Sequence, residues 1–119
     1  MSADTLRRAA SLMRERAEGA TPGPWDECAV KTFEGTYDCL APTGTQYEIC
    51  RLPRTPQGSA DSWHLASWHP AVALAVADWL DAEASRVERH HLAVTFDDFA
   101  VAAEPKALAV ARAYLGEAS

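Results

Sequence analysis

The sequence predicts a single α+β domain over residues 1–119: an N-terminal helix, a three-stranded antiparallel meander, and two or three C-terminal helices packed on one sheet face. Apolar residues recur every three or four positions before residue 19 and after residue 60, which is typical of amphipathic helices. Between residues 25 and 53 they recur every second position, which is typical of strands. A chain of 119 residues is long enough for one such core.

The first element is predicted to be a helix that ends near Gly19. Its apolar stripe consists of Leu6, Ala9, Ala10, Met13 and Ala17. Ser2 or Asp4 is well placed to cap its start. Residues 21–25, Thr-Pro-Gly-Pro-Trp, then prevent the helix from continuing because of their two prolines. We expect Trp25, which leaves this stiff segment, to enter the core.

The same helix carries four arginines: Arg7, Arg8, Arg14 and Arg16. Glu15 and Glu18 lie among them, which is typical of a solvated helix face with i,i+4 ion pairs such as Arg14–Glu18. The formal net charge of the whole chain is −6. Because nucleic acids and anionic membranes would be repelled by this charge, we expect neither as a partner.

The first hairpin of the meander is predicted to turn at Glu34 and Gly35. That turn places Cys28 opposite Ala41, and Val30 opposite Cys39, so that the side chains of both cysteines share one face.

The third strand is predicted near residues 46–52, after a turn at residues 42–45. Tyr47 and Ile49 are expected on its inner face, which leaves Cys50 on the other face. An open meander needs a helix to cover its apolar side, so the later helices are expected to pack there.

The C-terminal half is predicted to be helical after a loop at residues 53–60. A short helix is expected at 61–66, and Pro70 suits the first turn of a longer helix that runs to about Arg89. Its inward positions are predicted to be Val72, Val76, Trp79, Leu80 and Val87.

Two further elements are expected beyond that long helix. Residues 90–96 alternate like a strand, although the capping-box pattern at 95–98 favours a helix that starts there. Pro105 interrupts this helix, and residues 106–115 resume it.

Three cysteines, Cys28, Cys39 and Cys50, lie 11 residues apart and lack the short spacing of a zinc knuckle. Their odd number argues against a closed disulfide framework, so we expect three free thiols in a reducing compartment. No apolar run is long enough to cross a bilayer, and the first residues lack the apolar core of a signal peptide. The predicted location is cytoplasmic, or the host cytoplasm for a phage protein.

Catalytic and cofactor motifs are not found in the sequence. Gly-x-Ser-x-Gly, Walker A and Gly-x-Gly-x-x-Gly do not occur. His64 and His69 are separated by four residues, but the helix break before Pro70 removes the geometry of a helical metal pair. We therefore predict no cofactor and no resident metal, and we favour a protein that is not an enzyme.

Two tryptophans, Trp63 and Trp68, are the most informative candidates for binding. They lie beside His64 and His69, in the irregular approach to the long helix. Large amphipathic rings on an irregular segment are typical of interface hot spots, although such rings also cap hydrophobic cores. The predicted partner-binding residues are therefore Trp63, Trp68, His64 and His69.

Two alternatives stay open at this point. A small-ligand or metal pocket, which would allow enzymatic activity, is predicted around Tyr37, Cys39 and Tyr47, with His64 and His69 as further candidates. A homodimer is a second expectation, because an open meander leaves sheet edges unpaired.

Two motifs of this sequence occur in an order that is also found in other proteins. Residues 20–25, Ala-Thr-Pro-Gly-Pro-Trp, follow an arginine-rich helix, and residues 64–71, His-Leu-Ala-Ser-Trp-His-Pro-Ala, follow the strands. This succession resembles small proteins of actinobacteria and their phages that carry a Thr-Pro-Gly-Pro-Trp motif and a later His-Ile-Ala-like segment with proline. The resemblance implies a phage or prophage accessory protein, and therefore favours a non-catalytic module that binds a protein.

Overall fold

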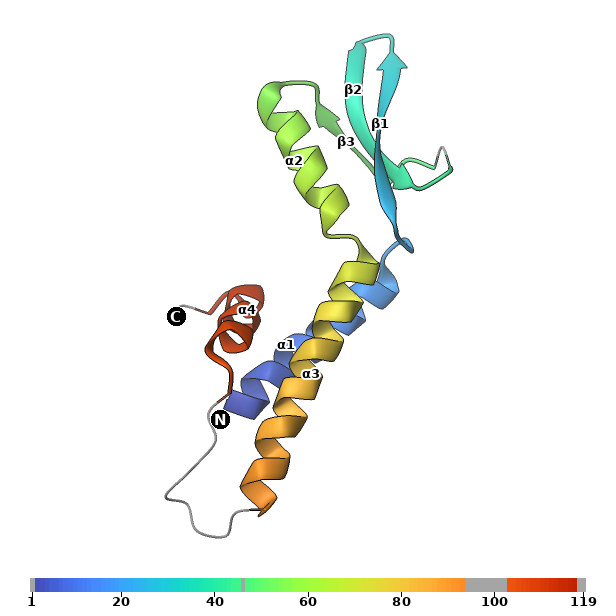
Figure 1. Ribbon diagram of the computed structural model, residues 1–119. Coiled ribbons are helices and arrows are strands. Elements are labelled where there is room, and N and C mark those ends of the chain that lie inside the picture. Colours follow the sequence, from blue (N-terminus) through green and yellow to red (C-terminus); the bar gives the residue numbers. More distant parts are fainter. Residues whose placement is uncertain (1, 46, 94–102, 118–119) are drawn as a thin grey trace. The chain divides into compact units, whose positions relative to one another are not determined.

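The computed structural model describes residues 2–45, 47–93 and 103–117. Its elements are α1 (Ser2–Gly19), β1 (Trp25–Thr32), β2 (Gly35–Pro42), β3 (Cys50–Pro53), α2 (Pro56–Ser67), α3 (Pro70–Ala93) and α4 (Pro105–Leu115) (Figure 1). The predicted α+β class is confirmed, with one N-terminal helix, a three-stranded antiparallel sheet and three later helices. No helix in the described ranges has the length and apolar character needed to span a membrane.

The contacts of the chain divide it into two compact units. The helical unit consists of residues 1–15 and 74–119, and the sheet unit consists of residues 16–73. Most contacts of each residue therefore lie within its own unit.

The helical unit is built around a core shared by α1, α3 and α4. Leu6, Met13 and Leu80 are its largest fully buried side chains. The remaining buried positions are small, namely Ala3, Ala9, Ala10, Ala77, Ala84, Val87, Ala103, Ala107 and Ala111. The predicted apolar stripe of α1 is confirmed, because each of its members is buried. Small side chains let the helices approach closely, so the few large ones fill most of the volume between them.

The inward face of α3 differs from the prediction at Trp79. This side chain is 44% exposed, whereas Ala77, Leu80 and Ala84 are fully buried. Trp79 is two positions from Ala77, which turns it by about 200° away from the buried stripe. The prediction of a core Trp79 is therefore wrong.

α3 is longer than predicted, and α4 begins with a capping side chain. α3 continues to Ala93, so residues 90–93 are helical and the strand-like interpretation of this part is wrong. The predicted helix start at 95–98 lies outside the described residues. α4 begins after Glu104, whose side chain accepts a hydrogen bond from the backbone N–H of Ala107 at 2.8 Å. Pro105 follows at the first helical position, which suits a residue without an N–H.

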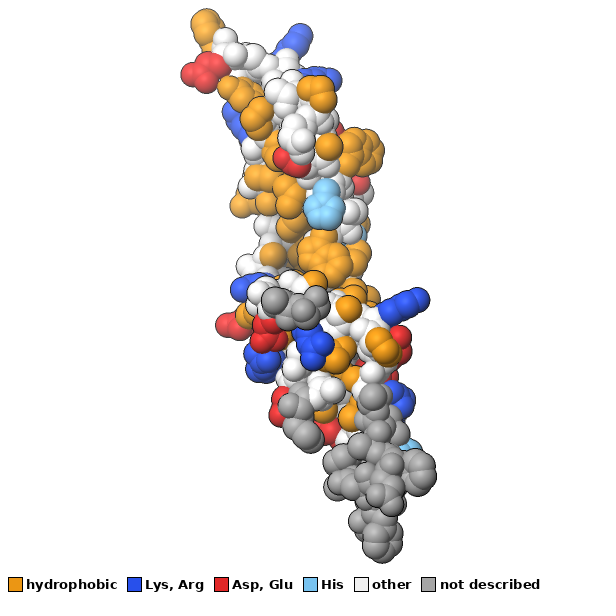
Figure 2. All heavy atoms as spheres, turned by 90° about the vertical axis from the view of Figure 1, so that its left-hand side faces the viewer, with side chains coloured by type: hydrophobic (Ala, Val, Ile, Leu, Met, Phe, Trp, Pro, Cys, Tyr) orange, Lys and Arg blue, Asp and Glu red, His pale blue; other side chains and the backbone are white. Residues whose placement is uncertain are grey.

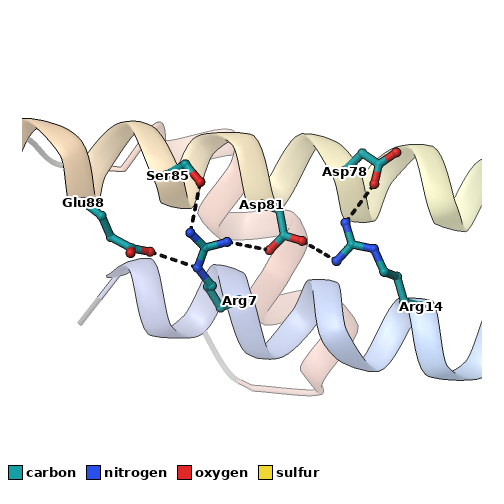
Figure 3. A network of polar contacts seen from close by, with 6 residues as sticks. All are labelled: Arg7, Arg14, Asp78, Asp81, Ser85 and Glu88. Carbon is teal, nitrogen blue, oxygen red and sulfur yellow. Dashed lines mark hydrogen bonds and ion pairs between the residues drawn. The ribbon is translucent and has the colours of Figure 1, made fainter.

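An ion-pair network joins α1 to α3 in the helical unit (Figure 3). Arg7 contacts Asp81, Ser85 and Glu88, at 3.0, 3.0 and 2.9 Å. Arg14 contacts Asp78 at 2.8 Å and also pairs with Asp81. Because Arg7 pairs near the end of α3 and Arg14 nearer its start, the two helices run antiparallel.

The predicted Arg14–Glu18 pairing is therefore replaced by contacts between helices. Hydrogen bonds to Glu88 and Asp81 raise the pKa of Arg7, and those to Asp78 and Asp81 raise the pKa of Arg14. The sequence could not show this, because the partners lie more than 60 positions away along the chain.

The sheet unit has strand order β1-β2-β3, with both pairs antiparallel. The register of the first hairpin differs from the prediction, because Thr32 pairs with Gly35 and the turn residues are Phe33 and Glu34. The hydroxyl of Thr32 explains the difference: it donates to the carbonyl oxygen of Gly35 at 3.0 Å and accepts from the N–H of Glu34 at 3.2 Å. Gly35, at φ 139°, follows the turn in a conformation that favours glycine.

This register places Cys28 directly opposite Cys39, and a disulfide joins them across the two strands. Their Cα atoms are 4.9 Å apart, within the usual range for a disulfide. The expectation of three free thiols is therefore wrong, and Cys50 alone of the three keeps its thiol. Burial, together with the nearby Glu48 carboxylate, raises the pKa of that thiol. Three free thiols were one argument for a cytoplasmic location. Without that argument, this location stays a prediction.

The third strand is shorter than predicted. β3 begins at Cys50. The N–H of Ile49, the residue before it, donates to the carbonyl oxygen of Leu40 at 2.6 Å. Tyr47 precedes the strand and is 67% exposed, so its predicted inward position is wrong. A turn in which both the N–H and the hydroxyl of Thr45 donate to the carbonyl oxygen of Pro42 delays the pairing.

α2 begins five residues earlier than predicted, inside the expected loop. Thr55 caps the helix by accepting a hydrogen bond from the N–H of Gly58 at 2.9 Å, and Pro56 takes the first helical position. α2 contacts all three strands, and Figure 1 shows it lying along the sheet. Gly58 and Ser62 are its buried residues, and Ser59 donates to the Asp38 carboxylate at 2.7 Å. This contact fixes which side of α2 stays exposed.

Candidate interaction surface on α2 and candidate pocket on the sheet

Trp63 and Trp68 are both exposed, by 67% and 40%. Gly58 and Ser62, four positions apart, face the sheet, so the two residues that follow Ser62, Trp63 and His64, project away from it. Trp68 is the C-cap residue of α2, and its N–H donates to the carbonyl oxygen of Leu65 at 3.1 Å. In the upper part of Figure 2, over α2, hydrophobic side chains gather around a histidine. α2 therefore presents apolar area to solvent.

The two indoles point in different directions from α2. Five positions turn an α-helix by about 140°, so Trp63 and Trp68 lie on different flanks of α2. His64 is exposed and lies between these flanks, and Leu65, which is 42% exposed, lies beside Trp68. A partner that contacts both indoles would have to cover the solvent-facing side of the helix.

His69 has a different environment from the other three predicted binding residues. It is half-buried, and its Nδ1 atom is buried without a hydrogen-bond partner among the described residues. A Cβ atom added to Gly23 would lie 2.5 Å from this Nδ1 atom. The Gly23–Pro24 peptide bond is cis, and the indole N–H of Trp25 donates to the carbonyl oxygen of Thr21 at 2.9 Å. The two motifs at residues 21–25 and 64–71 thus meet at a close contact between Gly23 and His69.

Replacing Gly23 with alanine is expected to lower the free energy of unfolding by about 1 to 2 kcal/mol, because the added methyl group would overlap the His69 imidazole. Urea unfolding measures this. The matched control is Gly19→Ala, since a Cβ there meets nothing within 4 Å. In a His69→Ala background the cost of Gly23→Ala should largely disappear. Equal stability of the Gly23→Ala and Gly19→Ala variants would contradict the contact.

A pocket of about 400 Å³ lies on the sheet unit. Its lining residues are Cys28, Ala29, Val30, Lys31, Cys39, Thr45 and Glu48. Of the residues predicted for a ligand pocket, Cys39 is among these, whereas Tyr37, Tyr47, His64 and His69 are not. Ala29, Lys31 and Thr45 are exposed, so the pocket opens to solvent.

The chemistry of this pocket is limited by the disulfide. Sulfur atoms that are bonded to each other offer neither a thiolate nucleophile nor a metal ligand. Lys31 and Glu48, which carry opposite charges, are among its lining residues. In the parts of the chain that the structure describes, no group of three His, Cys, Asp or Glu side chains is arranged to hold a metal ion. The pocket therefore suits binding of a small polar molecule better than nucleophilic chemistry.

Two structural features of these sites were not found from the sequence. The cross-strand disulfide depends on a turn that is shifted by one residue, and only the hydroxyl contacts of Thr32 reveal that shift. The contact between Gly23 and His69 joins residues that are 46 positions apart, although the Gly-Pro pair was a signal of a constrained backbone. Comparison with protein-family models, with curated proteins and with solved structures found no match for this chain.

Proposed function

We propose that this chain is a non-catalytic module that binds a protein partner, with Trp63 and Trp68 on α2 as its main contact residues. The observation that carries the proposal is the exposure of both indoles, 67% and 40%, on a helix whose other side is occupied by the sheet. Tryptophan is enriched among the hot-spot residues of protein interfaces, and the exposed Leu65 adds apolar area beside Trp68. The phage or prophage origin belongs to the same proposal and rests on the motif resemblance alone.

The chemistry of the surface suggests what the partner offers. Both indoles carry an N–H at the rim of a large apolar ring, so they suit apolar recesses edged by carbonyl or carboxylate acceptors. His64 lies between them and adds a polar group on the same side of α2. His69 would support this surface from its half-buried position against Gly23.

Replacing either indole with alanine is expected to weaken binding of the partner by about 30-fold or more, the usual effect of losing a hot-spot residue. Capture from a host lysate identifies the partner, and calorimetric titration of the purified partner gives the affinity. Phe33→Ala is the matched control, because Phe33 is a fully exposed aromatic residue at the hairpin turn of the same unit. Folded Trp63→Ala and Trp68→Ala variants that bind as tightly as Phe33→Ala would overturn the proposed surface.

The alternative function is binding of a small molecule in the pocket beside Cys39. Its volume, about 400 Å³, lies within the range of known ligand sites, and this observation favours it. Thermal unfolding with a panel of metabolites and metal ions separates the two functions. A ligand that raised the Tm of the parent protein, but not that of a Val30→Trp variant with a filled pocket, would favour the alternative. Metal analysis of protein purified without an affinity tag would reveal a resident ion.

A further inference from the structure

β1 lies at one edge of the sheet, with β2 on its other side and no further strand beside it in the described parts of the chain. It spans eight residues, from Trp25 to Thr32. Its exposed residues include Asp26, Ala29 and Lys31, although α2 contacts part of the strand. An edge strand of this length offers unpaired N–H and C=O groups to a further strand.

Two charged side chains on β1, Glu27 and Lys31, are not fully paired within the described parts of the chain. The Oε2 atom of Glu27 is buried without a hydrogen-bond partner, and no ion pair joins Lys31 to a carboxylate, in both cases as far as the described residues go. Both side chains lie on the face shared by Ala29, which pairs with Asp38 of β2. Four positions of extended chain separate Glu27 from Lys31 by about 13 Å, so they cannot pair with each other within one strand.

A second copy of the chain brings opposite charges to Glu27 and Lys31 in only one register. When two identical edge strands pair antiparallel about a two-fold axis perpendicular to the sheet, one central residue opposes its own copy. With Ala29 at the centre, Glu27 opposes Lys31 of the second copy, and Lys31 opposes its Glu27. The same register places Cys28 opposite Val30, and Asp26 opposite Thr32.

The other central residues give poorer pairings. A centre at Glu27 or at Lys31 opposes two like charges directly, which destabilises a strand pair. A centre at Cys28 places Glu27 opposite Ala29, and a centre at Val30 places Lys31 opposite Ala29, so neither forms an ion pair. Charge complementarity therefore selects the register centred on Ala29.

We infer that the protein forms a symmetric homodimer in which the β1 edges of two copies pair antiparallel about Ala29 and join the two sheets into one. The Glu27 and Lys31 side chains form two equivalent ion pairs across the interface. Main-chain hydrogen bonds between the two β1 strands stabilise the dimer, and the ion pairs determine its register. This inference does not rest on the proposed function, because the tryptophan surface lies on α2 and not on β1.

Charge reversal tests the pairing on the full chain. Sedimentation is expected to show a dimer for the parent protein. Single substitutions that change the dissociation constant of this dimer then report the register. Glu27→Lys brings lysine against lysine twice, and Lys31→Glu brings glutamate against glutamate twice. Each is expected to weaken the dimer by about tenfold or more, since two attractive pairs become repulsive.

Two further samples restore the complementary charges. The double variant Glu27→Lys with Lys31→Glu is expected to dimerise like the parent protein. An equimolar mixture of the two single variants is expected to form a heterodimer, because every opposing pair then carries opposite charges. Glu34→Lys, at the hairpin turn, is the matched control for net charge and should leave the dimer intact.

Each result decides the inference. A parent protein that stays monomeric at the highest soluble concentration would overturn it, and Lys31 would then be a charge that protects the edge from association. A dimer that resists both single reversals, or a mixture of the two single variants that stays monomeric, would overturn the proposed register. Circular dichroism of each variant confirms that the comparison is made between folded proteins.

Discussion

Replacing Gly58 with alanine is expected to lower the free energy of unfolding by about 2 kcal/mol or more, although alanine is the better helix former. Gly58 lies in the first turn of α2, where its N–H donates to the hydroxyl of Thr55. A Cβ atom at this position would lie 1.8 Å from the carbonyl oxygen of Pro53 and 2.9 Å from its carbonyl carbon. These are backbone atoms at the end of β3, so relief requires the helix to move away from the sheet.

The higher helix propensity of alanine opposes this steric destabilisation, and its contribution can be measured separately. Ala60→Gly, at an exposed position of the same helix, should cost about 1 kcal/mol through propensity alone. Chemical denaturation of both variants, monitored by far-UV circular dichroism, gives the two values. A Gly58→Ala variant as stable as the parent protein would show that α2 does not approach the end of β3 this closely.

Replacing Glu83 with glutamine is expected to lower the free energy of unfolding at neutral pH by about 1 to 2 kcal/mol and to remove part of the pH dependence of stability. Hydrogen bonds from Arg86, at 2.9 and 2.7 Å, are the main cause that lowers the pKa of Glu83 from 4.5 to about 2. The backbone N–H of Glu104 donates to the same carboxylate at 2.7 Å. The Glu83 side chain is 10% exposed but that of Arg86 is 48% exposed, so solvent screens this ion pair in part.

The sign of the pH dependence follows from the lowered pKa. The folded state holds the Glu83 proton less tightly than the unfolded chain, so this stabilisation is complete above pH 4.5 and is lost as the pH falls toward 2. Denaturation curves between these pH values should therefore converge for the parent protein and Glu83→Gln. Glu34→Gln, which removes an exposed carboxylate at the hairpin turn, corrects for the change in net charge. A constant difference across this pH range would contradict the role of Glu83.

Local sequence patterns predicted those parts of the fold that depend on neighbouring residues. The apolar stripe of α1 follows from spacing alone, and all of its members are buried. Pro70 opens α3 as predicted, because proline suits a first helical turn. The start of α2 was missed because Pro56 was interpreted as part of a loop, although Thr55 before it supplies the capping hydroxyl that marks a helix start.

Features that depend on distant residues could not be predicted in this way. The ion pairs of Arg7 and Arg14 depend on how α1 and α3 pack, and the spacing of charges within α1 favoured local pairs instead. The Cys28–Cys39 disulfide depends on the register of a turn that Thr32 sets. For the candidate site, the exposure of Trp63 and Trp68 depends on which side of α2 meets the sheet, and Gly58 and Ser62 determine that side.

The proposal that α2 binds a protein partner through its indoles is tested most directly by tryptophan fluorescence. A Trp25→Phe, Trp79→Phe variant keeps only Trp63 and Trp68, both accessible to a soluble quencher such as acrylamide. We predict strong quenching in the free protein and a marked decrease in quenching when the captured partner is added to saturation. Unchanged quenching in a complex shown to be fully formed would mean that the partner binds elsewhere, and would contradict the proposed function of this surface.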